Sequence, residues 1–142
     1  MKNTRIVICG AFLLLGCKDA GVTPENILSV RTDKTSYSVG ESINITIKGD
    51  QYSSAYFWHC NNRVAYEMQK KQPDQQWPPP GTIGLICLAI YPQGIIELAP
   101  TEVIQQSVSW SQPGTYRLRF IFGRDRSDIS KESVFSNEFV IQ

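Results

Sequence analysis

Hydrophobic and polar residues alternate along much of this chain, which is the pattern of half-buried β-strands. The clearest case is residues 43–47, where Ile43, Ile45 and Ile47 alternate with polar side chains. One face of this strand is expected to be buried and the other exposed to water. We expect further strands at residues 27–31, 55–60, 64–68, 103–110, 115–122 and 134–141.

A different pattern marks residues 83–91, which form a nearly continuous apolar run of strand length and favour a central strand. Polar and turn-forming residues separate the strands, and we expect exposed loops at residues 70–81, 91–101 and 123–133. No stretch has the period of a helix. About seven or eight short strands predict an all-β fold, a single β-sandwich domain over residues 27–142.

The amino-terminal segment has another composition. Lys2 and Arg5 give it a positive charge, and an uncharged, mostly apolar run follows at residues 6–15. A membrane-spanning helix needs about 20 apolar residues, so this run fits the apolar region of a signal peptide instead. The run ends in Leu14-Leu15-Gly16-Cys17, which resembles the lipobox of bacterial lipoprotein precursors.

The lipobox resemblance implies an address and an anchor. In that family the cysteine thiol carries a diacylglyceryl group, the signal peptide is cleaved before the cysteine, and the new amino terminus is acylated. Each buried CH₂ adds about 0.8 kcal/mol of membrane affinity, so three acyl chains anchor a protein stably where one does not. The resemblance thus assigns residues 1–16 to a signal peptide and Cys17 to lipidation. Residues 17–26 contain Gly21 and Pro24 and no apolar pattern, so we expect a flexible tether there. The alternative is that Cys17 is the last apolar residue of a buried helix.

Charge excludes one class of partner. The chain has 14 basic and 13 acidic residues, and removal of Lys2 and Arg5 with the leader leaves a net charge of about −1. Nucleic-acid binding needs clustered lysine and arginine, which this balance gives no reason to expect. The expected partners are the membrane, through the lipid on Cys17, and an unknown protein or glycan.

The cysteines agree with an extracytoplasmic location. Of the four, Cys9 leaves with the signal peptide and Cys17 takes the lipid. Cys60 and Cys87 remain as an even pair in an oxidising compartment, and they predict a disulfide. The chain-entropy model gives a loop of this length about 3–4 kcal/mol of stabilisation. Two separate buried thiols are the alternative.

Three short motifs resemble those of bacterial immunoglobulin-like and macroglobulin-type domains. They are Tyr37-Ser38-Val39-Gly40-Glu41, Pro113-Gly114-Thr115-Tyr116 and Ser136-Asn137-Glu138-Phe139-Val140. The resemblance implies an immunoglobulin-like sandwich. Antibody-type domains pair cysteines on the second and sixth strands, whereas Cys60 ends the third, so no antibody binding site transfers. We expect Gly40 and Gly114 to adopt conformations that a Cβ hinders, and the Tyr116 hydroxyl to bond a nearby backbone group.

Catalytic chemistry has little support. His59 is the only histidine, so a Ser-His-Asp mechanism must use it, and the adjacent Cys60 is expected in a disulfide. A serine brought near by folding is the route left open to a hydrolase. His59, Cys60, Met68 and Cys87 include soft ligands that suit copper, but their spacing matches no copper-binding loop that we can name. We expect no catalytic residue, no cofactor and no metal.

One segment is a candidate contact surface for a partner, namely Trp77, Pro78, Pro79 and Pro80. Proline stiffens such a loop toward an extended conformation at low entropic cost. A tryptophan on it can stack on a sugar or fill a pocket of a partner. The alternative is that Trp77 folds back to cap the open end of the sandwich.

These features favour a lipid-anchored binding or interaction module without catalytic activity, held in a bacterial cell envelope and facing the periplasm or the cell exterior. Two other functions stay open. A protease inhibitor or accessory subunit of an envelope enzyme complex would use the Trp77 loop. A small hydrolase would use His59.

Overall fold

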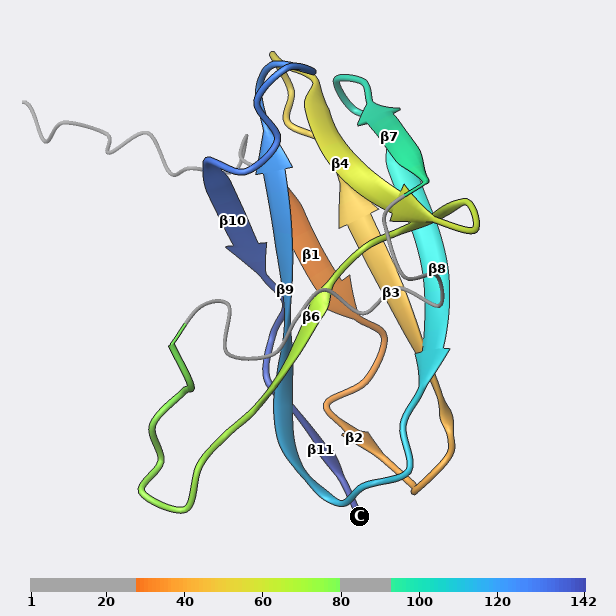
Figure 1. Ribbon diagram of the computed structural model, residues 1–142. Coiled ribbons are helices and arrows are strands. Elements are labelled where there is room, and N and C mark those ends of the chain that lie inside the picture. The colour runs from red at the N-terminus through yellow and green to blue at the C-terminus, as the bar shows by residue number, and fades with distance from the viewer. Residues whose placement is uncertain (1–27, 80–92) are drawn as a thin grey trace, which may run out of the picture.

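The computed structural model describes residues 28–79 and 93–142 (Figure 1). Within these ranges the chain is all-β, with eleven strands and no helix. Residues 1–27, with the predicted signal peptide, Cys17 and the tether, and the predicted apolar strand at 83–91, with Cys87, lie outside the described residues. In the part that is described, no helix is long and apolar enough to cross a membrane.

The smaller sheet has three antiparallel strands in the order β1-β3-β8. Their bounds are Ser29–Thr32 for β1, Ser42–Lys48 for β3 and Val103–Ser109 for β8. Ile43, Ile45 and Ile47 of β3 are buried and the residues between them are exposed, which confirms the predicted alternation. Burying one such side chain contributes about 1.5–3 kcal/mol, so β3 is a major source of the core.

The larger sheet has eight strands arranged around β9 (Gly114–Gly123). Arg119 of β9 pairs with Phe135 of β10 and with Glu67 of β6, so β10 and β6 lie on opposite edges of β9. The other bounds are β2 Ser36–Tyr37, β4 Ala55–Cys60, β5 Arg63–Val64, β6 Glu67–Lys70, β7 Gly94–Leu98, β10 Glu132–Phe135 and β11 Phe139–Ile141. Strands β5 and β7 pair with β4, and β2 runs parallel to β11.

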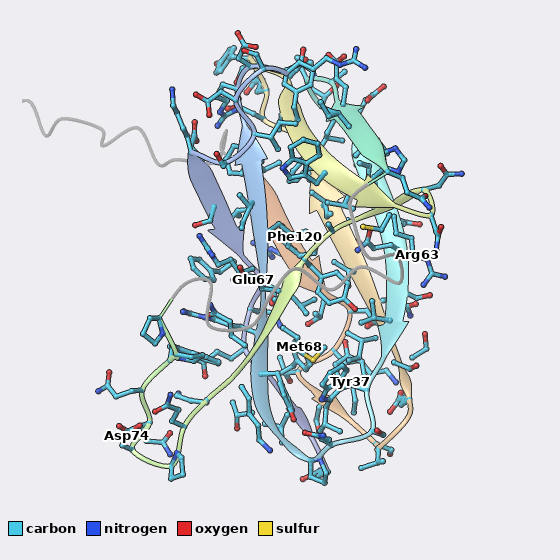
Figure 2. The ribbon with its side chains drawn as sticks, viewed as in Figure 1. Tyr37, Arg63, Glu67, Met68, Asp74 and Phe120 are labelled. Atoms are coloured by element: carbon cyan, nitrogen blue, oxygen red, sulfur yellow. The ribbon has the colours of Figure 1, made fainter. Side chains whose placement is uncertain are left out.

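The two sheets face each other across one shared core, as in a β-sandwich (Figure 2). The largest side chains with almost no exposure come from both sheets: Tyr37, Ile43, Ile45, Ile47, Phe57, Met68, Leu98, Tyr116, Leu118, Phe120, Phe139 and Ile141. Aromatic pairs run through the larger sheet, with ring centroids 5.7 Å apart for Phe57–Phe122 and 6.1 Å for Tyr116–Phe139. Such pairs add about 0.5–1.5 kcal/mol beyond burial.

Two turn predictions are confirmed. Gly40 has φ +78° and Gly114 has φ +150°, the region where a Cβ is strained. The hydroxyl of Tyr116 donates to the carbonyl of Gln112 at 3.0 Å, as expected for this tyrosine. Asn61 and Asn62, with φ 52° and 60°, form the tight turn between β4 and β5.

The single last strand predicted at residues 134–141 is wrong, because two strands occupy it. Ser136 interrupts the ladder: its backbone N–H donates to the carbonyl of Leu118, and its hydroxyl accepts from the N–H of Leu118 at 2.9 Å. The side chain of Asn137 then turns toward Thr32 on the other sheet. Polar side chains that bond backbone groups locally compete with strand pairing, and they end β10 here.

The alternation expected at residues 64–68 and the loop expected at 91–101 also need correction. Residues 64–69 are all buried, because Glu67 and Gln69 on the outer face pair with Arg119 and Arg117. The expected loop contains β7, whose residues pair with β4 from Ala55 to His59. Pairing with β4 stabilises β7. Turn-forming residues on either side of it indicate a loop in the sequence, so no strand was predicted there.

Candidate functional site

Three of the predicted site residues, Cys17, Cys87 and Pro80, lie outside the described residues. Cys60 ends β4 and its side chain is buried. The Cys60–Cys87 disulfide and the lipidation of Cys17 therefore stay predictions. Pro78 is buried and Pro79 is exposed beside the half-buried Trp77.

Trp77 lies on the outer face of the larger sheet. Its ring centroid is 4.3 Å from the guanidinium carbon of Arg117, which also lies 4.1 Å from the ring centroid of Phe135. The Nε–H of Arg117 donates to Gln69 at 2.8 Å, and burial lowers the pKa of this guanidinium. Cation–π contacts contribute about 0.5–2 kcal/mol each. Trp77 thus folds back onto the sandwich, and the guanidinium of Arg117 covers part of its ring.

His59 lies on β4 opposite Gly94 of β7. A Cβ at position 94 would come within 2.8 Å of the His59 Nε2 atom, so glycine leaves room for the imidazole. The Nδ1 atom of His59 is buried and has no hydrogen-bond partner among the described residues. Within residues 28–79 and 93–142, no group of three or more His, Cys, Asp or Glu side chains could hold a metal ion.

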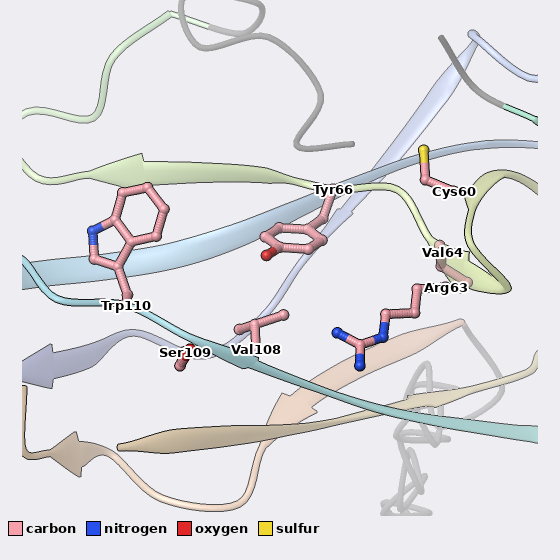
Figure 3. Close-up of a pocket in the computed structure, with 7 residues that line it drawn as sticks. All are labelled: Cys60, Arg63, Val64, Tyr66, Val108, Ser109 and Trp110. Atoms are coloured by element: carbon pink, nitrogen blue, oxygen red, sulfur yellow. The ribbon is translucent and has the colours of Figure 1, made fainter. Parts of the chain in front are cut away.

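A cavity of about 320 Å³ opens between the two sheets, where β8 faces β5 and β6 (Figure 3). It is lined by Cys60, Arg63, Val64, Tyr66, Val108, Ser109 and Trp110. In Figure 3 the hydroxyl of Tyr66 points toward Trp110 and the guanidinium of Arg63 points toward Val108. The volume is at the lower end of the range for small-molecule sites, about 300–1,000 Å³.

Two polar groups at this cavity differ in how they are held. The Tyr66 side chain is buried, with 9 % exposure, and its hydroxyl is not among the buried polar atoms of the described residues that lack a hydrogen-bond partner. Burial raises the pKa of this hydroxyl, and the charge of Arg63 opposes the rise. Arg63 is exposed, and its Nη1 donates to the carbonyl of Ser107 at 3.1 Å. A phenol donor and a guanidinium therefore flank an apolar space.

The side-chain amide of Gln106 joins the two sheets next to the cavity. Its Oε1 accepts from the N–H of Val64 at 2.9 Å, and its Nε2 donates to the carbonyl of Val64 at 3.1 Å. Gln106 and Val64 are both buried. The amide thus satisfies backbone groups of β5 that would otherwise need another strand.

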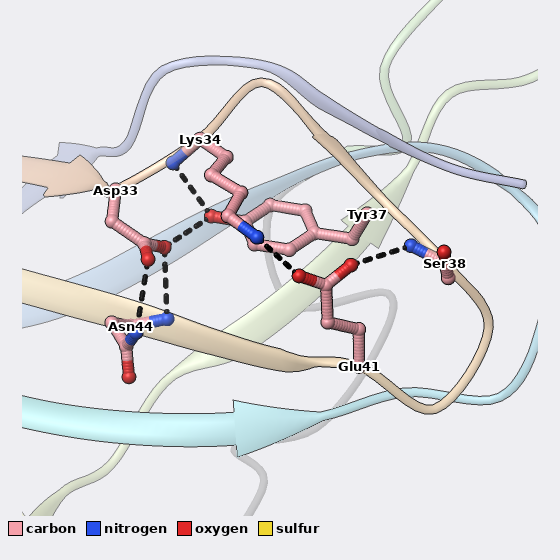
Figure 4. Close-up of polar contacts among 6 residues, drawn as sticks. All are labelled: Asp33, Lys34, Tyr37, Ser38, Glu41 and Asn44. Carbon is pink, nitrogen blue, oxygen red and sulfur yellow. Dashed lines mark hydrogen bonds and ion pairs between the residues drawn. The ribbon is translucent and has the colours of Figure 1, made fainter.

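A polar cluster of six residues forms around Asp33, in the turn after β1 (Figure 4). The Tyr37 hydroxyl donates to Asp33 at 2.6 Å and accepts from the N–H of Lys34 at 2.9 Å. Asn44 donates to the same carboxylate from its backbone and its side chain. These hydrogen bonds, Tyr37 first, lower the pKa of Asp33. The cluster continues through the Lys34–Glu41 ion pair to the N–H of Ser38. It secures the turn that joins β1 to β2.

Apart from Cys60, the cavity residues were not among the sequence-based candidates. Tyr66 was read as an alternating strand residue and Trp110 as the end of a strand. Arg63 follows an Asn-Asn turn and has no distinguishing neighbour. No local pattern marks these three, because the tertiary fold alone brings residues 63–66 opposite residues 108–110.

Neither a protein-family model nor a curated protein matches this sequence.

Proposed function

We propose that this protein is a lipid-anchored, extracytoplasmic binding module without catalytic activity, built on an immunoglobulin-like sandwich. The cavity beside Tyr66 carries the binding half of this proposal. It combines apolar walls with a phenol and with a cation at its mouth, which is the composition of a small-molecule site.

The sequence supports the anchoring half. Leu14-Leu15-Gly16-Cys17 follows a short apolar run, and residues 18–26 offer a tether with Gly21 and Pro24. A bond between Cys60 and Cys87 would fit the same oxidising compartment. The motifs at Tyr37 and Tyr116 support the immunoglobulin-like type, since both tyrosines are buried and both hydroxyls bond turn residues.

The experiment is expression of the full chain in a bacterium, followed by detergent phase partitioning and intact-mass measurement. The wild-type chain should enter the detergent phase, with a mass that matches cleavage before Cys17 plus acyl chains. Cys17→Ser should stay uncleaved and without acyl chains.

Cys9→Ser is the matched control, since it changes a cysteine of the leader outside the lipobox and should behave as the wild type. Recovery of the wild-type chain from the cytosol, uncleaved and without acyl chains, would contradict the proposal. Equal loss of acylation in both variants would show that the lipobox reading is wrong.

A further inference from the structure

We propose that the cavity between β8 and β5–β6 binds a small apolar carboxylate. Arg63 and Tyr66 would hold the carboxylate group, while Val64, Val108 and Trp110 would contact the apolar body. This inference rests on the proposed binding role and names its ligand class, but it does not depend on the lipid anchor.

Tyr66 is the first reason. Its side chain is buried and lines the cavity, and its hydroxyl points toward Trp110, another lining residue, in Figure 3. The Tyr66 ring is fixed against Phe120, with centroids 5.9 Å apart, so the hydroxyl cannot leave the cavity without loss of that contact. Burial raises its pKa, so the phenol is protonated at neutral pH and offers a hydrogen-bond donor. An oxygen of a ligand in the cavity could accept a hydrogen bond from this donor.

Arg63 gives the ligand its charge. One of its five N–H groups is used by the Ser107 carbonyl, which holds the guanidinium at the cavity mouth. No aspartate or glutamate is present among the described residues that line the cavity. The site therefore presents an uncompensated positive charge. Guanidinium groups bind planar carboxylates through paired N–H···O bonds, which favours a carboxylate over a neutral ligand.

The walls limit the rest of the ligand. Val64 and Val108 are aliphatic, and the Trp110 ring closes the far side from Arg63 in Figure 3. A volume of about 320 Å³ accommodates one ring or a short alkyl chain with its head group. These dimensions point to monocarboxylates such as arylalkanoates or medium-chain fatty acids, with the charged end toward Arg63.

The test compares two probes of equal shape, 3-phenylpropionate and its neutral amide. Each is titrated into the full chain, solubilised in non-ionic detergent at neutral pH, with the Trp110 indole N–H followed by NMR. Trp110→Phe identifies that resonance. The carboxylate should bind saturably and about tenfold more tightly than the amide, because a charge-assisted bond is lost in the amide.

Variants assign the two polar contacts. Arg63→Gln should weaken the carboxylate about tenfold and leave the amide unchanged. Tyr66→Phe should weaken both probes by several-fold, since it removes a donor and keeps the ring. The matched control is Arg31→Gln, an exposed arginine on β1, which should change neither affinity. The folded state of each variant is checked by its thermal transition.

Three results would overturn the inference. They are no saturable shift at Trp110 with the carboxylate, equal affinity of carboxylate and amide, and equal weakening by Arg63→Gln and Arg31→Gln. Binding of the amide alone would keep the binding module but reject the ligand class. Acylation of Cys17 plays no part in the titration. If Cys17 proved not to be acylated, the lipid anchor would be rejected and the cavity result would stand.

Discussion

The two lateral sides of the sandwich are joined by similar contacts and packed differently. On the side where β1 meets the β10–β11 segment, the amide of Asn137 accepts from the N–H of Thr32 at 2.9 Å and donates to its hydroxyl at 2.8 Å. On the side where β8 meets β5, the amide of Gln106 makes two hydrogen bonds to Val64. We call these the β1 side and the β8 side.

The aromatic rings account for the difference. On the β1 side, Tyr37 and Phe139 meet edge to face with centroids 5.7 Å apart, and the groove outside them is open and lined mainly by polar residues. On the β8 side, Trp110 packs on Tyr116 at 6.5 Å, while Tyr66 packs on Phe120 at 5.9 Å. Because Trp110 and Tyr66 pack on different partners, a cavity remains between them. We call each side-chain amide that bridges the two sheets, that of Gln106 or of Asn137, an amide clamp. Such a clamp holds the sheets together but does not fill the space beside it.

The largest expected effect separates the two clamps. Gln106→Ala should lower the free energy of unfolding by about 2–4 kcal/mol, because it leaves a buried N–H and a buried carbonyl of Val64 without partners. Asn137→Ala should cost about 1–2 kcal/mol, because the half-buried Thr32 groups can bond to water instead. Urea denaturation of the full chain measures both.

Gln105→Ala is the control, since Gln105 is the exposed neighbour of Gln106 on β8, and it should change stability by less than about 0.5 kcal/mol. Equal costs for Gln106→Ala and Asn137→Ala would mean that burial does not distinguish the two clamps. The comparison between the sides would then lose its energetic basis.

Local patterns predicted the parts of this fold that depend on neighbours in sequence. The alternating isoleucines of β3, the backbone conformation of Gly40 and the hydroxyl bond of Tyr116 needed only the residues around them. The break between β10 and β11 depends on Leu118 from another strand, and β7 depends on β4. No local sequence pattern marks those features, so the predictions from sequence were wrong there.

The candidate site could not be predicted from local sequence patterns for the same reason. Trp77 was conspicuous in sequence, yet its ring is partly covered by Arg117, 40 positions later. Tyr66 and Arg63 looked ordinary, yet the fold sets them opposite Val108 and Trp110 across the sheets. These side chains line one cavity only because the whole chain packs in this way, and no local pattern reports that packing.

A methyl group added on each side sharpens the comparison. Val30→Ile on β1 should cost about 1–3 kcal/mol, because Val30 is buried in the core and an added methyl group overpacks it. Val108→Ile lines the cavity, so the added methyl group should be neutral or stabilise by up to about 0.8 kcal/mol. Thermal unfolding of the two variants gives the difference directly. Destabilisation of both by the same amount would mean that the cavity does not accept added volume.

The smallest expected effect concerns acid on the β1 side. Hydrogen bonds from Tyr37 and Asn44 lower the pKa of Asp33 below its usual value of 3.8, so the folded state favours the carboxylate. Its contribution is therefore present at neutral pH and is lost as pH falls through the folded pKa. Asp33 is exposed, so the loss is modest. Asp33→Asn should be less stable than the wild type at pH 7, and the gap should narrow below about pH 4. The stability difference between Tyr37→Phe and the wild type should also narrow below about pH 4, since this variant removes the main hydrogen-bond donor to the Asp33 carboxylate. The stability difference between Tyr66→Phe, on the β8 side, and the wild type should stay constant with pH, because a phenol is neutral in acid. Urea titrations at pH 7, 5, 4, 3 and 2 distinguish these outcomes, and a constant gap for Asp33→Asn would remove acid sensitivity from the differences between the two sides.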